Sequence, residues 1–327
     1  MWGSVLEILK EKAAAGVEVR FMYDGMCSIS LLPPDYPKKI RRFGIQCKMF
    51  SPIRPVLSTT QNNRDHRKIC VIDGKTGFTG GINLGDEYIN RKERFGYWKD
   101  TAVMIKGDAV QSLTMLFLQM WNVSELKKEK FEPYLTTMAK ELKPETGFVL
   151  PYGDSPYDHE NVGEEVYVHI LNHAKKYVHI MTPYLIIDQS MITALTFAAK
   201  RGVDVKLILP HIPDKKFVFA LAKSHYKELL KAGVRIYEYT PGFVHAKIFT
   251  SDDEKAVVGT INLDYRSLYH HFENGCFMAD CDAVADIRAD FERMMAQSRD
   301  VTQQYREGRS ATLRLGQLVM RFFAELL

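Results

Sequence analysis

A repeated motif constrains this chain more than any other feature of its sequence. The segment HRKICVIDGKTGFTGGIN begins at His66, and the segment HAKIFTSDDEKAVVGTIN begins at His245. Both contain His-x-Lys, then an Asp after four intervening residues, then Gly-x-x-Asn after six more. The two histidines lie 179 positions apart in a chain of 327 residues, so the repeat predicts two similar halves.

The order of expected elements around the two motifs is also the same. Upstream, AAAGVEVRFMYD and AAKRGVDVKLILP each read as the end of a helix, a Gly turn and a buried strand. Next come YPKKIRRFGIQCKMFSP and YKELLKAGVRIYEYTPG, each a basic helix, a Gly and a strand, and the motifs themselves read as two short strands joined by a turn. Alternating helices and strands predict an α/β fold used twice in tandem, as two sandwich domains.

The two halves differ at their beginnings. In the second half, EEVYVHILNHAKKYVHIMTPYLIIDQSMITAL predicts a helix, a buried strand and the start of another helix, and the first half has no match for that first helix and strand. We therefore expect the chain to lack the opening βα unit of its first half. An unpaired sheet edge favours association, so a homo-oligomer stays open.

These patterns place the expected domain boundaries. They are a first, N-terminally incomplete domain at 1–123, a charged and Pro-bounded linker at 124–153, a second domain at 154–300 and an amphipathic tail at 301–327. The tail sequence ATLRLGQLVMRFFAELL suits either packing on the body of the protein or lying on a lipid surface.

Composition and cysteine usage narrow the class of protein. A hydrophobic content of 46% and a charged content of 26% are typical of a globular protein, and the formal charge of +4 permits an anionic partner without demanding one. No stretch approaches the roughly 18–20 apolar residues that a membrane-spanning helix needs. Five cysteines without CxxC spacing indicate reduced thiols, and we expect Cys70 and Cys276, in apolar stretches, to be buried.

His-x-Lys, present twice, indicates a particular chemistry. In a strand, residues i and i+2 point to the same face, so each motif would project an imidazole together with an ammonium group. If a pseudo-two-fold brings both pairs into one cleft, one imidazole can attack as a nucleophile, the other can act as general acid and base, and the cations can stabilise an anionic transition state. Transfer at a phosphodiester fits these groups best. Asn83 and Asn262, each 17 residues after its histidine, suit donation to phosphate oxygens. We expect no metal and no cofactor, because the two histidines lack a third good ligand at suitable spacing.

The motifs resemble the paired HxKxxxxD signatures of the phospholipase D superfamily. Four further segments resemble those of bacterial cardiolipin synthases: GGINLGDEY, FGYWKDT, TPGFVHAK and VGTINLDYRS. The resemblance runs from about Gly3 to the C-terminal apolar segment. This resemblance implies two tandem phospholipase D-like α/β domains related by a pseudo-two-fold, with the active site at their interface. Relatives usually begin with membrane-spanning segments and the first βα unit. We expect this chain to differ from them by lacking both.

The resemblance implies a two-step phosphatidyl transfer. One histidine attacks the phosphorus of phosphatidylglycerol and releases glycerol, and the phosphatidyl-histidine passes to a second phosphatidylglycerol, which gives cardiolipin. By similarity His66 is the nucleophile and His245 the acid and base, although the repeat leaves the reverse assignment open. The resemblance implies that four side chains bind phosphate oxygens: Lys68, Lys247, Asn83 and Asn262.

Carboxylates are needed to hold the second ring nitrogen of each histidine. The candidates are Asp100 in FGYWKD and Glu273, which lies 28 residues after His245. Asp73 and Asp252 belong to the signature, but their place after the lysine suggests that they brace a turn. The position after the signature glycine is Gly81 in one copy and Thr260 in the other, so a hydroxyl there is not common to both halves.

The resulting hypothesis is a cardiolipin synthase-like phosphatidyltransferase at the cytoplasmic face of a bacterial membrane. Its expected partners are phosphatidylglycerol, other anionic phospholipids and the membrane surface, which the chain would meet peripherally; no nucleic acid is expected. Two alternatives stay open. One is a phospholipase D-type phosphodiesterase or nuclease, and the other is a truncated, non-catalytic protein that binds anionic lipid.

Overall fold

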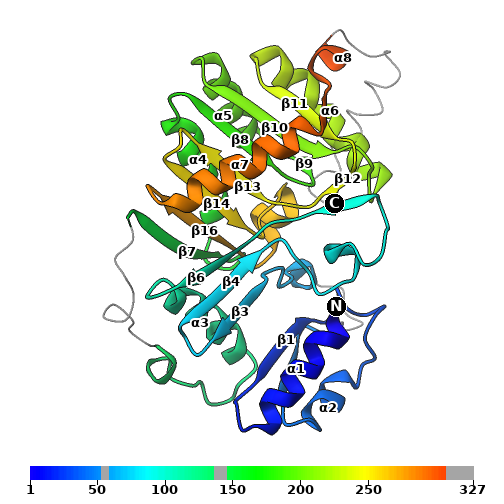
Figure 1. Cartoon of the computed structure of the whole chain (residues 1–327), viewed down its shortest axis with the longest axis vertical. Coiled ribbons are helices and arrows are strands. Elements are labelled where there is room, and N and C mark those ends of the chain that lie inside the picture. Colours follow the sequence, from blue (N-terminus) through cyan, green and yellow to red (C-terminus); the bar gives the residue numbers. More distant parts are fainter. Residues whose placement is uncertain (53–58, 136–145, 307–327) are drawn as a thin grey trace.

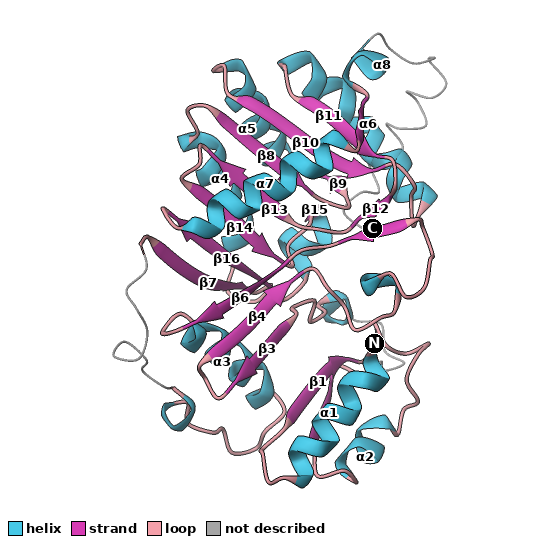
Figure 2. Ribbon diagram, in the orientation of Figure 1, coloured by secondary structure: helices cyan, strands magenta, loops and turns pink. Residues whose placement is uncertain are grey.

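A computed structural model describes residues 1–52, 59–135 and 146–306. Helices and strands alternate at the start of each half and a run of strands follows, in agreement with the α/β fold that the sequence predicts (Figures 1 and 2). In the first half they are α1 (Trp2–Ala14), β1 (Arg20–Asp24), α2 (Tyr36–Arg41), β2 (Gln46–Phe50), β3 (Ile69–Ile72), β4 (Thr76–Gly80), β5 (Tyr97–Lys99), β6 (Ala102–Lys106) and α3 (Val110–Asn122).

The second half largely repeats this order and opens with three strands and a helix that have no counterpart among the described residues of the first half. Its elements are β7 (Phe148–Asp154), α4 (Val162–His173), β8 (Tyr177–Met181), β9 (Leu185–Ile186), α5 (Gln189–Lys200), β10 (Asp204–Pro210), α6 (Lys216–Ala232), β11 (Arg235–Tyr239), β12 (Gly242–Val244), β13 (Ile248–Ser251), β14 (Lys255–Gly259), β15 (Leu263–Asp264), β16 (Glu273–Ala279), α7 (Asp282–Ala296), β17 (Ser298–Asp300) and α8 (Thr302–Arg306). The last residues of the expected linker thus form β7, and most of the expected tail lies outside the described residues.

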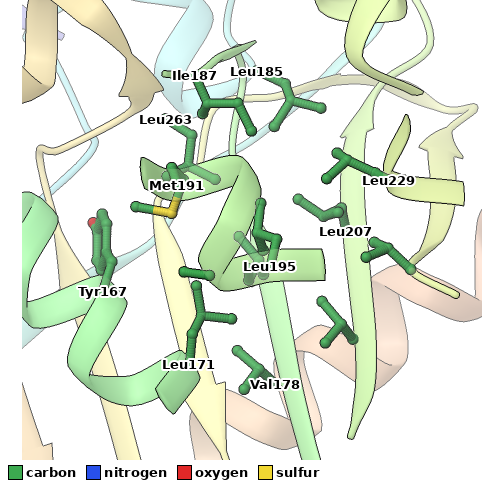
Figure 3. Packing of buried hydrophobic residues seen from close by; sticks show 14 of the residues in the cluster. Tyr167, Leu171, Val178, Leu185, Ile187, Met191, Leu195, Leu207, Leu229 and Leu263 are labelled. Carbon is green, nitrogen blue, oxygen red and sulfur yellow. The ribbon is translucent and has the colours of Figure 1, made fainter. Parts of the chain in front are cut away.

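The second half is built on one eight-stranded sheet with the order β17-β11-β10-β8-β13-β14-β16-β7. Strand β8 is its centre, paired in parallel with β10 and antiparallel with β13. Helices α4 and α5 cover one face over a core of buried aliphatic side chains, part of which Figure 3 shows, and α7 covers the other. Tyr167 of α4 stacks on Phe249 of β13 with ring centroids 3.9 Å apart.

The strands of the first half form separate, smaller sheets. Strand β1 pairs in parallel with β2, and β3-β4-β6 form an antiparallel sheet of three strands. These strands correspond to β10, β11, β13, β14 and β16, and within the described residues no strand takes the place of β8 between β1 and β3. In Figure 1, α1, α2 and β1 lie at one end of the molecule and the large sheet at the other, with β3, β4 and β6 between them.

The outer face of β3-β4-β6 overturns one expectation about the core. Cys276 is buried as expected, but Cys70 is exposed, together with Phe78 and Met104, its neighbours across the sheet. In the second half the matching face carries Phe249 under α4, whereas no described helix covers it in the first half. The apolar run around Cys70 therefore predicts a strand, but it does not by itself predict that the Cys70 side chain is buried.

The two halves join through a shared apolar core. Ile105, Val110 and Leu113 of the first half pack with Val258 and Cys276 of the second. Among the described residues, no helix has the length and apolar character needed to cross a bilayer.

Candidate active site

Each His-x-Lys lies between a backbone contact with the other half and the next strand of its own half. His66 follows an isolated bridge between Asp65 and Phe272, and its backbone N–H donates to the Phe272 carbonyl oxygen at 3.0 Å. His245 follows β12, which pairs with β5, and its N–H donates to the Lys99 carbonyl oxygen at 2.7 Å. These contacts bring the two motifs together across a pseudo-two-fold.

The expectation that each motif lies within a strand is wrong. His66 and Lys68 precede β3, and His245 and Lys247 stand between β12 and β13. The chain must switch its pairing partner at this point, so regular strand hydrogen bonding is interrupted there. The lysines still return to their histidines: Lys68 Nζ donates to the His66 carbonyl oxygen at 2.6 Å and Lys247 Nζ to the His245 carbonyl oxygen at 2.5 Å.

Each half supplies a carboxylate to the histidine of the other half. His66 Nδ1 lies 2.9 and 3.0 Å from the two carboxylate oxygens of Glu273, and His245 Nδ1 lies 2.8 Å from Asp100 Oδ2. The two carboxylates hold equivalent places, because Gly80 pairs with Ala102 and Gly259 with Gly275, two residues after Asp100 and Glu273 respectively. Both carboxylates are buried.

This pairing fixes the histidine tautomers. A carboxylate can only accept, so Nδ1 of each ring carries the proton and Nε2 is left unprotonated in the neutral imidazole. Burial lowers the pKa of His66 to about 4 and that of His245 to about 4, which keeps both rings neutral near pH 7. Burial would raise the pKa of Glu273, but its hydrogen bonds and charge interactions with His66 and His271 together outweigh this and hold the pKa below its ordinary value.

The two lysines carry the positive potential of the site. Burial lowers the pKa of Lys68 from its ordinary value and lowers that of Lys247 to about 7. Lys247 Nζ lies 2.9 Å from His245 Nδ1 and 3.0 Å from Nε2. A bound phosphodiester anion would favour the charged ammoniums, so the site is suited to an anion.

The position after the signature glycine differs between the halves for a structural reason. The Thr260 hydroxyl donates to Glu273 Oε2 and is fully buried, so it holds the carboxylate in place. At Gly81 an added Cβ would overlap the Asp100 carboxylate, which leaves no room for a side chain. The Thr260 hydroxyl therefore positions the carboxylate of the longer side chain, Glu273. The carboxylate of the shorter Asp100 lies where a side chain at position 81 would otherwise be.

The rings beside the two histidines also differ. Trp98 lies 5.4 Å from His245, centroid to centroid, and Tyr88 meets His245 edge-on at 5.2 Å. The residue equivalent to Trp98, two positions before the carboxylate, is His271, whose ring centroid lies 5.6 Å from that of His66. The His66 side chain is 21% exposed and that of His245 8% exposed, so His66 is the more accessible of the two and has the more polar neighbour.

One group of these side chains could hold a metal ion. His66, His271 and Glu273 place ligand atoms within 4.8 Å of one another. The sequence reasoning considered only the two motif histidines and missed this set. A metal there would compete with the hydrogen bond from His66 to Glu273.

The remaining predicted residues lie around this centre or away from it. Asn83 donates from Nδ2 to the Tyr88 hydroxyl at 2.6 Å, and Oδ1 of Asn262 is buried with no hydrogen-bond partner among the described residues. Asp252 accepts from the backbone N–H groups of residues 175–177 at 2.7–2.9 Å, so it braces the turn before β8. Asp73 holds the same turn position, with φ of 55° against 57° for Asp252, and is exposed. The chemical roles assigned to these residues stay predictions.

Sequence reasoning missed several of the residues that shape the site. Arg64, two positions before His66, is buried in an ion pair with Asp24, at the end of β1, with Nη2 2.9 Å from Oδ1. Trp98 and His271 were also missed, although aligning the repeats on Asp100 and Glu273 would have marked them as equivalent positions. The Thr260 hydroxyl was noted from the sequence, but its hydrogen bond to Glu273 was not predicted.

Comparisons with known proteins decide the family. The family described as "Cardiolipin synthase, PLD-like domain" matches residues 3–121 and 167–295, which cover both motifs. The chain belongs to this family. A cardiolipin synthase from Geobacillus sp. is 39% identical over 321 residues, 98% of this chain and 64% of its own length. An uncharacterized protein of Streptococcus mutans is 58% identical over all 327 residues, 70% of its own length.

Solved structures agree on the fold. A phosphatidylserine synthase from Haemophilus influenzae covers 99% of this chain with a TM-score of 0.69 at 14% identity, and the match spans 84% of that structure. At this identity the likeness shows the fold alone. The chain spans about two thirds of the length of the cardiolipin synthases it matches.

Proposed function

We propose that this chain is a phosphatidyltransferase of the cardiolipin synthase type, acting through a phosphohistidine intermediate. The observation that supports this most directly is the reciprocal pairing, in which Glu273 holds His66 and Asp100 holds His245 across the interface of the halves. Two oriented imidazoles at the interface of the halves, with two lysines beside them, suit in-line displacement at a phosphodiester.

In the first step Nε2 of His66 attacks the phosphorus of phosphatidylglycerol. His245 is neutral in the free site and takes up a proton from solvent when the substrate binds, because the phosphodiester anion and Asp100 both favour its imidazolium. A P–N bond forms, the bond from phosphorus to the glycerol headgroup oxygen breaks, and that oxygen takes the proton from Nε2 of His245, so glycerol leaves. The greater exposure of the His66 side chain supports this choice of nucleophile. Lys247 lies against both ring nitrogens of His245, which makes Nε2 of that ring the less accessible.

In the second step a hydroxyl of another phosphatidylglycerol attacks the phosphohistidine. Its proton passes to Nε2 of neutral His245, its oxygen bonds to phosphorus, and the P–N bond breaks to free His66. The net reaction turns two phosphatidylglycerols into cardiolipin and glycerol. Asn83 and Asn262, next to the two histidine–carboxylate pairs in the repeat, are proposed to donate to the phosphate oxygens.

The test is turnover of phosphatidylglycerol in mixed micelles, with glycerol release and lipid mass spectrometry as readouts. We expect cardiolipin and glycerol from the parent and neither from His66→Ala or His245→Ala. The control is His169→Ala, because this histidine is exposed on α4 and belongs to neither motif. Phosphatidic acid as the lipid product would mean that water is the acceptor. No turnover by a folded parent would overturn the proposal.

A further inference from the structure

The edge of the sheets that carries the two histidines also carries an exposed apolar surface. Strands β8 and β10 run parallel and β13 runs antiparallel to them, so the start of β13, just after His245, lies at the edge where β8 and β10 end. The loop after β10 therefore lies on the active-site edge. The loop after β1, residues 25–35, holds the equivalent place in the first half.

Contacts confirm that the loop after β1 starts at the site. Asp24, the last residue of β1, accepts from Arg64 and from the backbone N–H of Asp65, the residue before His66. The same carboxylate accepts from the N–H groups of Met26 and Cys27 at 2.9 Å, which anchors the first turn of the loop. The loop then projects Ile29 and Leu31, which are 62% and 80% exposed.

The second half repeats this combination at the equivalent place. Residues 211–215 follow β10, and Phe217 in the first turn of α6 is 48% exposed. Two hydrogen bonds anchor this loop. The Tyr184 hydroxyl donates to Asp214 at 2.6 Å, and His211 Nδ1 lies 2.9 Å from Glu238 Oε2. Two anchored loops thus present apolar side chains at the edge of the sheets that carries the two histidines.

Basic residues lie close in sequence to the apolar side chains in both loops. Lys38 and Lys39 are exposed on α2, and Lys215 and Lys216 are exposed at the start of α6. Residues 25–42 contain four Lys or Arg against one acidic residue, Asp35. Exposed apolar side chains beside lysines are the combination that binds an anionic lipid surface.

We propose that residues 25–39 and 211–217, here called the rim loops, dock the active-site edge on the surface of an anionic lipid bilayer. The inference rests on the proposed function, because a flat lipid surface that meets both loops would present its phosphates at the cleft between them. A plane can contact two sites related by a pseudo-two-fold at once. Ile29, Leu31 and Phe217 enter the interfacial region, and the lysines pair with anionic headgroups.

The test is co-sedimentation with vesicles of phosphatidylglycerol and phosphatidylcholine. The loop variant is the double substitution Ile29→Ser with Leu31→Ser. A second variant, Phe217→Ser, changes the other rim loop. The matched control is Phe148→Ser with Leu150→Ser: these residues are also exposed, but they lie in β7, where Phe148 pairs with Ala279 at the edge opposite to Glu273. Melting temperatures and monomer size are measured for every variant.

We expect the loop variant to bind vesicles about tenfold or more weakly, as loss of two inserted aliphatic side chains implies, and the control to bind as the parent does. Lys38→Gln with Lys39→Gln should remove part of the salt-dependent binding. Equal binding by the loop variant and the parent, or an equal loss in the control, would overturn the inference. Conversion of a dimer to a monomer with vesicle binding unchanged would instead make the rim loops a contact between two copies.

Turnover separates this inference from the proposed function. On dihexanoyl phosphatidylglycerol below its micelle concentration, the loop variant should turn over as the parent does, and on vesicles it should be about tenfold slower or more. If the parent turns over neither substrate, the proposed function fails, while vesicle binding still decides the docking surface. Equal turnover by parent and loop variant on vesicles would contradict the docking surface alone.

Discussion

Glu273 decides which nitrogen of His66 carries a proton, and this makes a single carboxylate worth testing. Glu273→Gln keeps the size of the side chain but removes its charge, so the His66 tautomer is no longer fixed and a phosphohistidine cation loses its partner. We expect glycerol release to fall by about 10²–10⁴-fold, with the folded state retained. Glu254→Gln is the control, because Glu254 is exposed in the β13–β14 turn. Activity of Glu273→Gln within threefold of the parent would show that the carboxylate does not orient His66.

The same two histidines should set part of the pH dependence of stability. Burial lowers their pKa to about 4, below the value near 6.5 of an unfolded histidine, so the unfolded state binds more protons between these values. Stability is therefore fully present above about pH 6.5 and is lost as the pH falls toward 4.

Urea unfolding at pH 7 and pH 5 measures this loss. We expect the parent to lose about 1–2 kcal/mol of unfolding free energy for each of the two histidines. The double variant His66→Gln with His245→Gln should lose correspondingly less over the same interval. An equal loss in parent and variant would mean that other groups, such as His179, whose pKa burial also lowers to about 4, account for the whole effect.

Among the elements, the turn between α4 and β8 depends on one aspartate of the signature. Asp252 accepts from three backbone N–H groups at 2.7–2.9 Å and is buried, so truncation leaves those donors without a partner. We expect Asp252→Ala to lower the unfolding free energy by about 2–4 kcal/mol and to leave kcat of the folded protein within about threefold. Denaturant unfolding and glycerol release are the measurements. A large fall in kcat at unchanged stability would assign Asp252 to the chemistry and not to the turn.

The elements show what the sequence can and cannot predict. Periodicity, glycines and β-branched runs placed β1, α2, β2, β3 and β4, because these signals are local. The pairing of β12 with β5 joins residues about 145 positions apart, and no local signal specifies it. This pairing is also what moves His245 out of a strand. The repeat still predicted that the two motifs come together, because two equal halves around a pseudo-two-fold bring equal residues close to each other, and the roles of these residues stay predictions.

The carboxylates were predictable as residues but not as partners. Asp100 and Glu273 were candidates on general grounds, whereas the crossing, in which each serves the histidine of the other half, appears only once the halves are packed. Trp98 and His271 escaped notice because an indole and an imidazole share no residue class. Only their common position, two before a carboxylate, relates them.

In the whole molecule, stability should be distributed unequally between the halves. Strand β8 is hydrogen-bonded on both sides within an eight-stranded sheet, while β1 and β3 each pair with one described strand. The face that carries Phe78 and Met104 is exposed, whereas its counterpart lies under α4. Fewer buried contacts around a strand lower the free energy of opening it locally.

Native-state hydrogen exchange measures this difference strand by strand. We expect the amides of β8, β13 and β14 to exchange only with global unfolding, and those of β1, β2 and β3 to exchange through openings of lower free energy, since less apolar surface is exposed when they separate. Because β3 leads out of His66, bound inorganic phosphate should raise the protection of β3 more than that of β1, if the anion binds between the two motifs. Uniform protection across both halves would show that the shared core around Ile105 and Val258 makes the molecule one cooperative unit, despite the separate sheets of its first half.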